Sequence, residues 1–421
     1  MPRWIYTALL NLLVPFALFK LWWRARKQPE YLQHIPERFG IYRMPEPERP
    51  VIWLHAVSVG ETRAAAPLVE HFLQHYPDHS ILLTHATPTG RATGVQLFGD
   101  RVLRAYLPYD LPEAMQHFLD FFQPRIGLLL ETELWFNLVE ACARRKTPLL
   151  LINARLSEKS ARGYARLGRL TRQSLQNLAA IVAQTEADAM RFRALGAREV
   201  SVAGNLKFDV LPPPDVAMKG EVLRASLGLT RPVFLAASTR EGEEALILDV
   251  VLSTPVAGLL TVIVPRHPQR FDEVASLLQK REIPYVRRSS HVAVPADCQV
   301  VLGDSMGEMY AYYAACDVAF IGGSLVPCGG QNLIEACAMG RPVLIGPHTW
   351  NFSEITQSSI VAGAARCVQD ASGLQHEVQQ LLADPAARAS MSASALAFCR
   401  GQGGAVERIM QLIVPLLPAA T

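Results

Sequence analysis

Residues 51–65 read VIWLHAVSVGETRAA, an apolar run that leads through a turn at Gly60 into a helical pattern beginning near Glu61. Both faces of the run 51–57 are apolar, which is typical of a strand buried inside a parallel sheet. A strand that leads into a helix is half of a βαβ unit, so the stretch predicts an α/β fold. The turn lacks GxGxxG and GxxxxGK spacing and therefore does not indicate a dinucleotide or P-loop triphosphate site.

The same pattern recurs on both sides of residue 212. In the first half the further apolar runs are SILLTHA (80–86), RIGLLLE (125–131), PLLLINA (148–154) and AAIVAQT (179–185). In the second half they are VFLAAS (233–238), LLTVIVP (259–265), VAFIGG (318–323) and RPVLIGP (341–347). Each half therefore predicts an open Rossmann-like sheet of parallel strands.

Three consecutive prolines in LPPPD, residues 211–215, separate the two halves. Proline cannot continue a helix or a central strand, so this segment predicts a semi-rigid linker. We expect an N-terminal domain over 28–210, a linker over 211–216 and a C-terminal domain over 217–421, whose last helix could pack back on the first domain. Facing α/β domains usually bind a ligand in the cleft where the carboxyl ends of their strands meet, so functional side chains should follow strands.

Composition favours a two-domain globular protein and excludes several other classes. The chain has 421 residues, of which 50% are hydrophobic and 19% are charged, which excludes disorder, collagen and coiled coil. Lys and Arg number 41 against 38 Asp and Glu, a formal net charge of +3. This excess is far below that of typical nucleic-acid binders, so we expect no nucleic-acid partner. The seven cysteines are scattered without CxxC spacing, which favours reduced thiols in a cytosolic compartment.

The first 27 residues predict a membrane anchor. Residues 4–23 read WIYTALLNLLVPFALFKLWW, a length at the threshold for spanning a bilayer. Trp22 and Trp23 resemble an interfacial aromatic belt, and the basic residues that follow them place the rest of the chain in the cytoplasm. A cleaved signal peptide is disfavoured because no small-residue cleavage site follows. A buried amphipathic first helix is the alternative, favoured by Pro15.

Acidic side chains stand where predicted strands of the first half end. Glu61 follows the run 51–57, and its carboxylate could be either a helix N-terminal acid stabilised by the dipole or a general base. Glu131 and Glu133 follow the run 125–131. Two acids at a strand end are costly to bury unless they meet cations or a substrate hydroxyl. An ion-paired loop with a packing tryptophan is the alternative interpretation.

Basic side chains accompany these acids. Arg155 and Arg162 follow the run 148–154 and, with the acids, suit a polar acceptor that bears phosphates or sugars. Lys207, in GNLKFD just before the linker, could stabilise negative charge on a departing phosphate. Taken alone, Lys207 would be better explained as a solvated surface lysine.

In the second half, Ser238 and Thr239 follow the run 233–238 and also fit a plain helix cap. Arg266 and His267 lie between Pro265 and Pro268. The prolines fix the backbone there, and an arginine and a histidine held in this way suit a phosphate.

Glycine-rich segments complete the candidate set. GDSMGEM (303–309) and GGSLVPCGGQN (322–332) precede helical patterns, so their backbone N–H groups could approach an anion closely at a helix start. Asn332 and Glu335 are three residues apart in the expected first helical turn and should point to the same loop, where Glu335 could accept from ribose hydroxyls. A glycine-rich loop alone is a weak signal.

Together these motifs resemble the 3-deoxy-D-manno-octulosonic acid (Kdo) transferases of Gram-negative lipopolysaccharide synthesis. The resemblance spans nearly the whole chain, up to GPHTWNF (346–352), and seven ordered motifs are more specific than any one of them. They are HAVSVGE (55–61), ETELWFN (131–137), NARLSEKSARGY (153–164), GNLKFD (204–209), PRHPQRF (265–271), GDSMGEM (303–309) and GGSLVPCGGQNLIEA (322–336).

The resemblance implies a GT-B fold with an N-terminal membrane-anchor helix. It also implies an inverting glycosyltransferase that moves Kdo from CMP-Kdo to lipid IVA at the cytoplasmic face of the inner membrane. Glu61 would be the catalytic base, and Glu131 and Lys207 would support the transition state. The resemblance implies no cofactor, and because no DxD motif stands at a strand end we expect no metal in the chemistry.

The resemblance also assigns binding residues to the two halves. On the acceptor side they are Ser58, Arg155 and Arg162. For CMP-Kdo they are Ser238, Pro265, Arg266, His267, Gly307, Glu308, Met309, Gly323, Asn332, Leu333, Ile334 and Glu335.

Two departures and two alternatives accompany this interpretation. Phe136 stands where the family often has a proline after the tryptophan, which could alter the loop beside Glu131, and Pro327 and Cys328 interrupt the glycine-rich segment. A GT-B enzyme that uses another nucleotide sugar, and a non-catalytic GT-B-like binding protein, are the alternative functions. The number of Kdo units transferred and the oligomeric state are not predicted.

Overall fold

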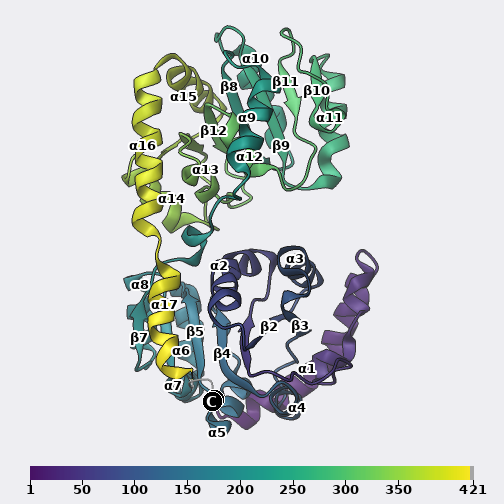
Figure 1. Ribbon diagram of the computed structural model, residues 1–421, viewed down its shortest axis with the longest axis vertical. Helices are drawn as coiled ribbons and strands as arrows, with labels where there is room; N and C mark the ends of the chain where they lie inside the picture. Colours follow the sequence, from purple (N-terminus) through teal and green to yellow (C-terminus); the bar gives the residue numbers. More distant parts are fainter. Residues whose placement is uncertain (418–421) are drawn as a thin grey trace. The chain divides into compact units, whose positions relative to one another are not determined.

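The apolar runs form two seven-stranded parallel sheets in the computed structural model, which describes residues 1–417 (Figure 1). One compact unit comprises Met1–Val210 together with residues 402–417, and the other comprises Leu211–Gly401. The unit boundary therefore falls at the first residue of the proline-rich segment 211–215.

In the first unit, the strand order reverses between β1 and β4, as in Rossmann-like sheets. All five runs predicted in this half are strands, and β3 and β7 are additional short strands at the two edges. In spatial order the strands are β3 (Leu103–Tyr106), β2 (Ser80–His85), β1 (Val51–His55), β4 (Pro124–Leu130), β5 (Leu149–Ala154), β6 (Ala180–Ala183) and β7 (Val200–Val202).

Apolar side chains from alternate strand positions pack into two hydrophobic cores, one on each face of this sheet. Ile52 and Leu54 belong to one core, and Val51 and Trp53 belong to the other. Gly127 in β4 is required by this packing, because a Cβ there would lie 2.7 Å from the Trp53 ring. The covering helices are α2 (Val59–His75), α3 (Pro88–Phe98), α4 (Pro112–Phe122), α5 (Phe136–Arg145), α6 (Glu158–Leu167), α7 (Arg169–Asn177) and α8 (Glu186–Ala194).

The last helix, α17 (Ala405–Ile413), packs on the first unit (Figure 1), the arrangement left open above for the end of the expected domain 217–421. Ile409 and Ile413 are buried in the same core as Ile52. The Asp209 carboxylate accepts from the Gly404 and Val406 N–H groups at 2.7 and 2.6 Å, which caps the start of α17.

The second unit repeats the architecture, with its strand order reversing between β8 and β12. All four predicted runs are strands, and β10, β11 and β14 are additional strands of three residues each. In spatial order the strands are β10 (Tyr285–Arg287), β11 (Val300–Leu302), β9 (Leu260–Pro265), β8 (Val233–Thr239), β12 (Val318–Ile321), β13 (Val343–Ile345) and β14 (Ala365–Cys367). The helices are α9 (Val216–Leu227), α10 (Glu243–Ser253), α11 (Phe271–Lys280), α12 (Met309–Ala315), α13 (Ile334–Ala338), α14 (Ser353–Val361), α15 (Ala371–Ala383) and α16 (Pro385–Gln402).

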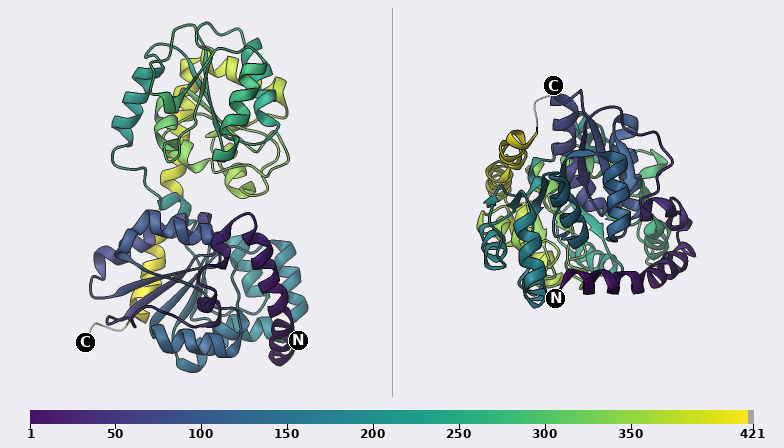
Figure 2. Two further views of the ribbon diagram at one scale, coloured as in Figure 1. Left: turned by 90° about the vertical axis from the view of Figure 1, so that its right-hand side faces the viewer. Right: turned by 90° about the horizontal axis from the view of Figure 1, so that it is seen from below.

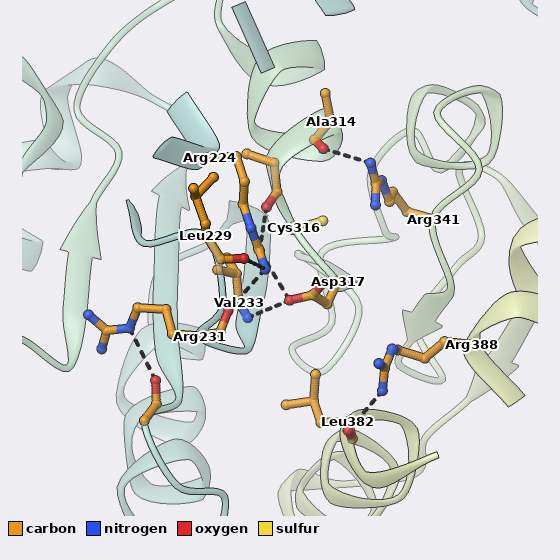
Figure 3. A network of polar contacts seen from close by, with 12 residues as sticks. Arg224, Leu229, Arg231, Val233, Ala314, Cys316, Asp317, Arg341, Leu382 and Arg388 are labelled. Carbon is orange, nitrogen blue, oxygen red and sulfur yellow. Dashed lines mark hydrogen bonds and ion pairs between the residues drawn. The ribbon is translucent and has the colours of Figure 1, made fainter. Parts of the chain in front are cut away.

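A polar network holds the amino ends of the central strands in the second unit (Figure 3). Arg224 of α9 donates to the Asp317 carboxylate at 3.1 Å and to the Ala315 carbonyl at 2.9 Å. Asp317 in turn accepts from the Val233 N–H at 2.8 Å, where β8 begins. This network lies at the strand starts and leaves the carboxyl ends of the same strands to the candidate site.

Helix α1 (Arg3–Ala25) runs along the outside of the first unit (Figure 2). It is long and apolar enough to cross a membrane by length and composition, a property that some core helices and signal sequences share. Leu12 is 77% exposed and Phe16 is 62% exposed, whereas Leu21 is the single buried residue of this fully described helix. The alternative of a buried first helix is therefore wrong.

Candidate active site

In the first unit, the predicted acids lie at the point where the strand order reverses. Glu61 follows β1 and Glu131 follows β4, and these two strands are hydrogen-bonded neighbours. In open α/β sheets, ligands bind outside the carboxyl ends of the strands at such a switch point.

Glu61 lies in the first turn of α2, which begins at Val59 and thus two residues earlier than the sequence predicted. The actual N-cap is Ser58, whose hydroxyl accepts from the Glu61 N–H. The carboxylate of Glu61 accepts from the Val57 N–H at 2.8 Å and from the Ser58 hydroxyl at 2.9 Å. These two donors orient the carboxylate at the strand-to-helix junction.

Burial raises the pKa of Glu61 from its ordinary value of 4.5 to about 7. The residue is only 9% exposed, and the nearby carboxylates of Glu131 and Glu133 raise the pKa further, while the bonds from Val57 and Ser58 lower it. A carboxylate with a pKa near neutrality holds a proton more strongly than an ordinary glutamate, which suits a general base.

Glu131 is paired with Lys207 in the same unit. The Lys207 Nζ lies 3.5 Å from the Glu131 Oε1, and both side chains are about a quarter exposed. Glu131 takes a left-handed backbone conformation with a φ of 60°, and such strain in a non-glycine residue clusters at functional sites. Lys207 follows Asn205, whose side chain accepts from the Lys207 N–H at 3.0 Å.

The loop after β4 ends in a buried aromatic group. Burial also raises the pKa of Glu133, and the Trp135 ring meets the His55 ring edge to face at 6.0 Å between centroids. Phe136, which replaces the family's common proline, is buried at the start of α5 and contacts the Tyr6 ring at 5.0 Å.

The predicted acceptor residues lie at different distances from the acids. Ser58 bonds Glu61 directly, and the Arg155 carbonyl accepts from the Thr132 hydroxyl at 2.8 Å, which ties the end of β5 to the Glu131 loop. Arg162 lies on the exposed face of α6. No hydrogen bond or ion pair within residues 1–417 joins its side chain to Glu61 or Glu131.

In the second unit, the equivalent switch point brings Ser238 of β8 next to the glycine-rich segment after β12. Ser238 has a φ of 57° and stands at a register shift between β8 and β9. A Cβ at Gly322 would lie 2.6 Å from the Ser238 carbonyl oxygen, so only glycine fits there. Ser238 and Thr239 are strand residues and do not cap α10, contrary to the alternative drawn from the sequence; Thr239 donates instead to the Glu244 carboxylate at 2.7 Å.

The backbone N–H groups at Gly323 are already occupied, which corrects the expectation that this loop is open to an anion. The Glu243 carboxylate accepts from the Gly323, Ser324 and Leu325 N–H groups at 2.6, 3.1 and 3.0 Å. Glu243 is fully buried, and burial raises the pKa of its carboxyl group against the lowering effect of these bonds. The Glu243 carboxylate therefore occupies the anion-binding concavity that these N–H groups form, and it fixes the conformation of the loop.

Arginines surround His267 beside the same loop. Arg240 donates to the His267 Nε2 at 2.7 Å, and Arg266 donates to the Gln331 side chain at 3.2 Å. Burial lowers the pKa of His267, and Arg240, Arg266 and Arg270 lower it further. The guanidinium groups around the imidazole provide a positively charged surface that suits a phosphate ester.

The remaining predicted residues line the starts of two short helices. Glu308, just before Met309 of α12, accepts from Arg288 at 3.0 Å and from Ser305 at 2.5 Å, and Gly307 has a φ of 80°. The Asn332 amide donates to the Glu335 carboxylate at 3.3 Å, which agrees with a shared loop.

The position of Asn332 differs from the prediction in one respect. α13 begins at Ile334, so Asn332 precedes the helix instead of lying in its first turn. Its side-chain oxygen accepts from the Ile334 N–H at 3.1 Å. Leu333 and Ile334 are buried, which leaves Asn332 and Glu335 as the polar groups of this segment.

Three further residues of the site, Arg240, Glu243 and Gln331, are not among those that the sequence predicts. Glu243 and Arg240 stand in STREGEE (238–244), where the signal was read as a helix cap. In residues 1–417, no group of three or more His, Cys, Asp or Glu side chains is arranged to hold a metal ion, and all seven cysteines are free.

Two Rossmann-like units, each with polar groups at the switch point of its sheet, are the architecture of the GT-B fold class. A solved structure with this architecture is UDP-GlcNAc 2-epimerase from Neisseria meningitidis bound to UDP-GlcNAc. It aligns over 87% of this chain and all of its own, with a TM-score of 0.60 and 16% identity, and this likeness concerns the fold alone.

The chain belongs to the Kdo transferase family. Residues 33–210 match the family model for 3-deoxy-D-manno-octulosonic-acid transferase (kdotransferase). The 3-deoxy-D-manno-octulosonic acid transferase of Bordetella pertussis is 43% identical over 98% of this chain and 99% of its own length, and that of Haemophilus influenzae is 37% identical over 99% of both. The chain is thus a glycosyltransferase that transfers Kdo in lipopolysaccharide synthesis, which confirms the resemblance drawn from the motifs.

Proposed function

We propose that the protein transfers Kdo from CMP-Kdo to lipid IVA with inversion at the anomeric carbon, and that Glu61 is the catalytic base. The observation that carries this proposal is a buried carboxylate with a pKa of about 7, oriented by two donors at the switch point of the first sheet. A base of this strength takes a proton from a hydroxyl most effectively near neutral pH.

Inversion requires a single displacement. The acceptor hydroxyl oxygen forms the new bond to the anomeric carbon of Kdo, the bond from that carbon to the CMP phosphate oxygen breaks, and CMP leaves with the electron pair. The proton of the acceptor hydroxyl goes to the Glu61 carboxylate. The Val57 N–H and the Ser58 hydroxyl hold the Glu61 carboxylate in a fixed orientation during this step.

Two further residues of the first unit would support the transition state. Lys207 carries a positive charge that stabilises negative charge on the departing phosphate, and Glu131, 3.5 Å from it, holds the ammonium in place. Ser58, Arg155 and Arg162 would contact the acceptor, whose phosphates suit guanidinium groups.

The second unit would bind CMP-Kdo. Arg266 and His267, with Arg240 beside them, offer charge and hydrogen bonds to the phosphate, and Asn332 and Glu335 offer polar atoms to the ribose. Backbone groups near Ser238, Pro265 and Gly307–Met309 would complete the contacts of the donor. The loop that contains Gly323 would border the site, in the shape that the Glu243 carboxylate gives it.

Helix α1 would hold the enzyme on the cytoplasmic face of the inner membrane, where a lipid acceptor is found. Its exposed apolar residues suit the acyl region of a bilayer, and Arg26 stacks over the Trp22 ring at 4.3 Å. Basic and aromatic side chains at one end of an apolar helix suit the headgroup region on the cytoplasmic side.

The test is transfer by the wild-type enzyme in lipid vesicles, resolved by mass. We expect lipid IVA to gain Kdo when CMP-Kdo is the donor, and the mass shift counts the units added. The product linkage should have the anomeric configuration opposite to that of the donor. Parallel reactions with UDP-GlcNAc serve as controls. A folded, vesicle-bound enzyme that transfers no Kdo, or that transfers the sugar of UDP-GlcNAc, would contradict the proposal.

A further inference from the structure

Asp110 is a buried carboxylate that lies outside the set of residues assigned to catalysis. It stands in the loop between β3 and α4 and is 3% exposed. Its carboxylate accepts from the Asn137 N–H at 3.0 Å and from the Leu138 N–H at 2.8 Å. The Asn137 amide group returns a bond to the Asp110 carbonyl oxygen at 2.6 Å.

These contacts make Asp110 the cap of α5. Trp135, the residue at the N-cap position, makes no side-chain cap bond among the described residues, so the first N–H groups of α5 depend on Asp110. A carboxylate at a helix start satisfies these donors and complements the helix dipole. α5 begins directly after the loop 131–135, which carries Glu131 and Glu133.

The apolar helix α1 is joined to the same cap by two hydroxyl groups. The Tyr6 hydroxyl donates to the Asp110 carboxylate at 2.8 Å, and the Thr7 hydroxyl donates to the Asn137 side-chain oxygen at 3.1 Å. The Tyr6 ring packs edge to face on Phe136, the first residue of α5. Burial raises the pKa of the Asp110 carboxyl group, whereas the bonds from the Asn137 N–H, the Tyr6 hydroxyl and the Leu138 N–H lower it. The Tyr6 bond therefore helps to stabilise the ionised form of Asp110 and joins α1 to the start of α5.

We propose that Tyr6 and Asp110 are positioning residues, which fix the start of α5 and thereby hold the Glu131–Trp135 loop in its active geometry. The inference rests on the proposed function, because the position of Glu131 and Glu133 affects Kdo transfer only if Glu61 is the base. Through this junction, the helix that meets the lipid surface is a rigid part of the acceptor domain, and its seating determines the geometry of the catalytic loop.

The experiment compares Tyr6→Phe with wild type, using the full chain in lipid vesicles. The substitution removes one hydroxyl and keeps the ring that packs on Phe136. We expect kcat for Kdo transfer to fall about tenfold, because a small displacement of a catalytic loop is costly, while the KM for CMP-Kdo stays unchanged. Hydrogen exchange at the Asn137 and Leu138 amides should accelerate.

Tyr42→Phe is the matched control. Tyr42, like Tyr6, is a half-buried tyrosine of the first unit, and its hydroxyl donates to the Tyr106 carbonyl at 3.4 Å, away from α5. We expect wild-type kcat and wild-type exchange at Asn137 and Leu138 for this variant. A second variant, Thr7→Val, removes the other hydroxyl of the junction and should lower kcat in the same direction as Tyr6→Phe.

Wild-type kcat and exchange in both Tyr6→Phe and Thr7→Val would overturn the inference, as would an equal loss of kcat in Tyr42→Phe. Failure of the wild type to transfer Kdo would instead contradict the proposed function. The exchange measurement needs no turnover, and in that case it alone decides whether Tyr6 holds the start of α5.

Discussion

At Glu61, opposing influences set the proton affinity of one carboxyl group. Burial and the nearby charges of Glu131 and Glu133 favour the protonated form, whereas the Val57 N–H and the Ser58 hydroxyl favour the ionised form. Burial is the largest of these influences, and the pKa of Glu61 settles at about 7. The residue is therefore both oriented and basic enough to take a proton from a sugar hydroxyl.

The first prediction concerns the pH dependence of kcat/KM. Because the base must be ionised, kcat/KM should rise with pH up to about 7, by about tenfold per unit on the acid side, and level off above it. The measurement is the kcat/KM profile of the wild type for lipid IVA between about pH 5 and 9. An acid limb that ends near the ordinary glutamate pKa of 4.5 would contradict the assignment.

Some site residues could be predicted from the sequence and others could not, for identifiable reasons. Glu61 and Glu131 follow apolar runs, and the rule that ligands bind beyond strand ends was sufficient to select them. The pairing of Glu131 with Lys207 joins residues 76 positions apart, so only the fold shows it. Tyr6 stands in an apolar run that predicts lipid contact, and its bond to Asp110 depends on tertiary structure.

At the scale of elements, the backbone N–H groups of the loop after β12 bind a carboxylate of the protein itself, where the sequence predicted that they would bind an anionic ligand. Glu243, the first residue of α10, accepts from the N–H groups of Gly323, Ser324 and Leu325, and also from Arg240 N–H at 3.1 Å. The loop is therefore preorganised, with its shape fixed by the protein itself. We expect CMP to meet the outer side of this loop.

The second prediction concerns Glu243→Gln. The amide offers one acceptor oxygen in place of two, so buried N–H groups lose partners, and the free energy of unfolding should fall by about 2 kcal/mol. Affinity for CMP should also weaken because the loop loosens. Urea unfolding and CMP titration measure the two effects. Glu241→Gln, at an exposed position of the same segment, is the control, and equal stability of both variants would contradict this account.

The sequence predicted nine strands, all of which are present, and missed five. Four of these are the edge strands of the two sheets, and each contains half-buried or exposed residues, so their patterns are less apolar: β3, β7, β10 and β14. The fifth, β11, is fully buried but only three residues long. The start of α2 was placed two residues late because the Ser58 cap was not taken into account.

At the scale of the whole molecule, the two units share one plan and differ in what their switch points carry. The first carries acids and a lysine, and the second carries arginines and a histidine. Residues 402–417 cross from the end of α16 to the core of the first unit. The sequence shows that α17 has an apolar face, but a pattern of this kind does not specify which sheet will cover it.

Helix α1 illustrates the same limit. Its apolar length predicted an anchor, and its exposed side chains agree with a lipid-facing role, whereas the junction with α5 requires contacts 104 and 130 residues apart in sequence. Helix α1 belongs to the first compact unit in this structure, and its role as a membrane anchor stays a prediction.

The central claim is that Glu61 is the base for Kdo transfer, and the most direct test is Glu61→Gln in the vesicle assay with CMP-Kdo and lipid IVA. The variant should fold, because it removes a carboxylate whose ionisation opposes folding. In the wild type, the raised pKa of Glu61 stabilises the folded state fully below about pH 4.5, and this stabilisation is lost as the pH rises through about 7. The new amide can accept from the Val57 N–H through its oxygen and donate to the Ser58 hydroxyl oxygen through its NH₂ group, so both contacts are kept, unlike those of Glu243 with its four N–H donors. The melting temperature of Glu61→Gln at pH 8 should therefore equal or exceed that of the wild type.

Glu70→Gln is the matched control, since Glu70 lies on the same helix and pairs with Arg101 at an exposed position. We predict that Glu70→Gln transfers Kdo like the wild type. Glu61→Gln should bind CMP normally and lose at least about a hundredfold in kcat. Transfer by folded Glu61→Gln at a rate near that of Glu70→Gln would contradict the role of Glu61.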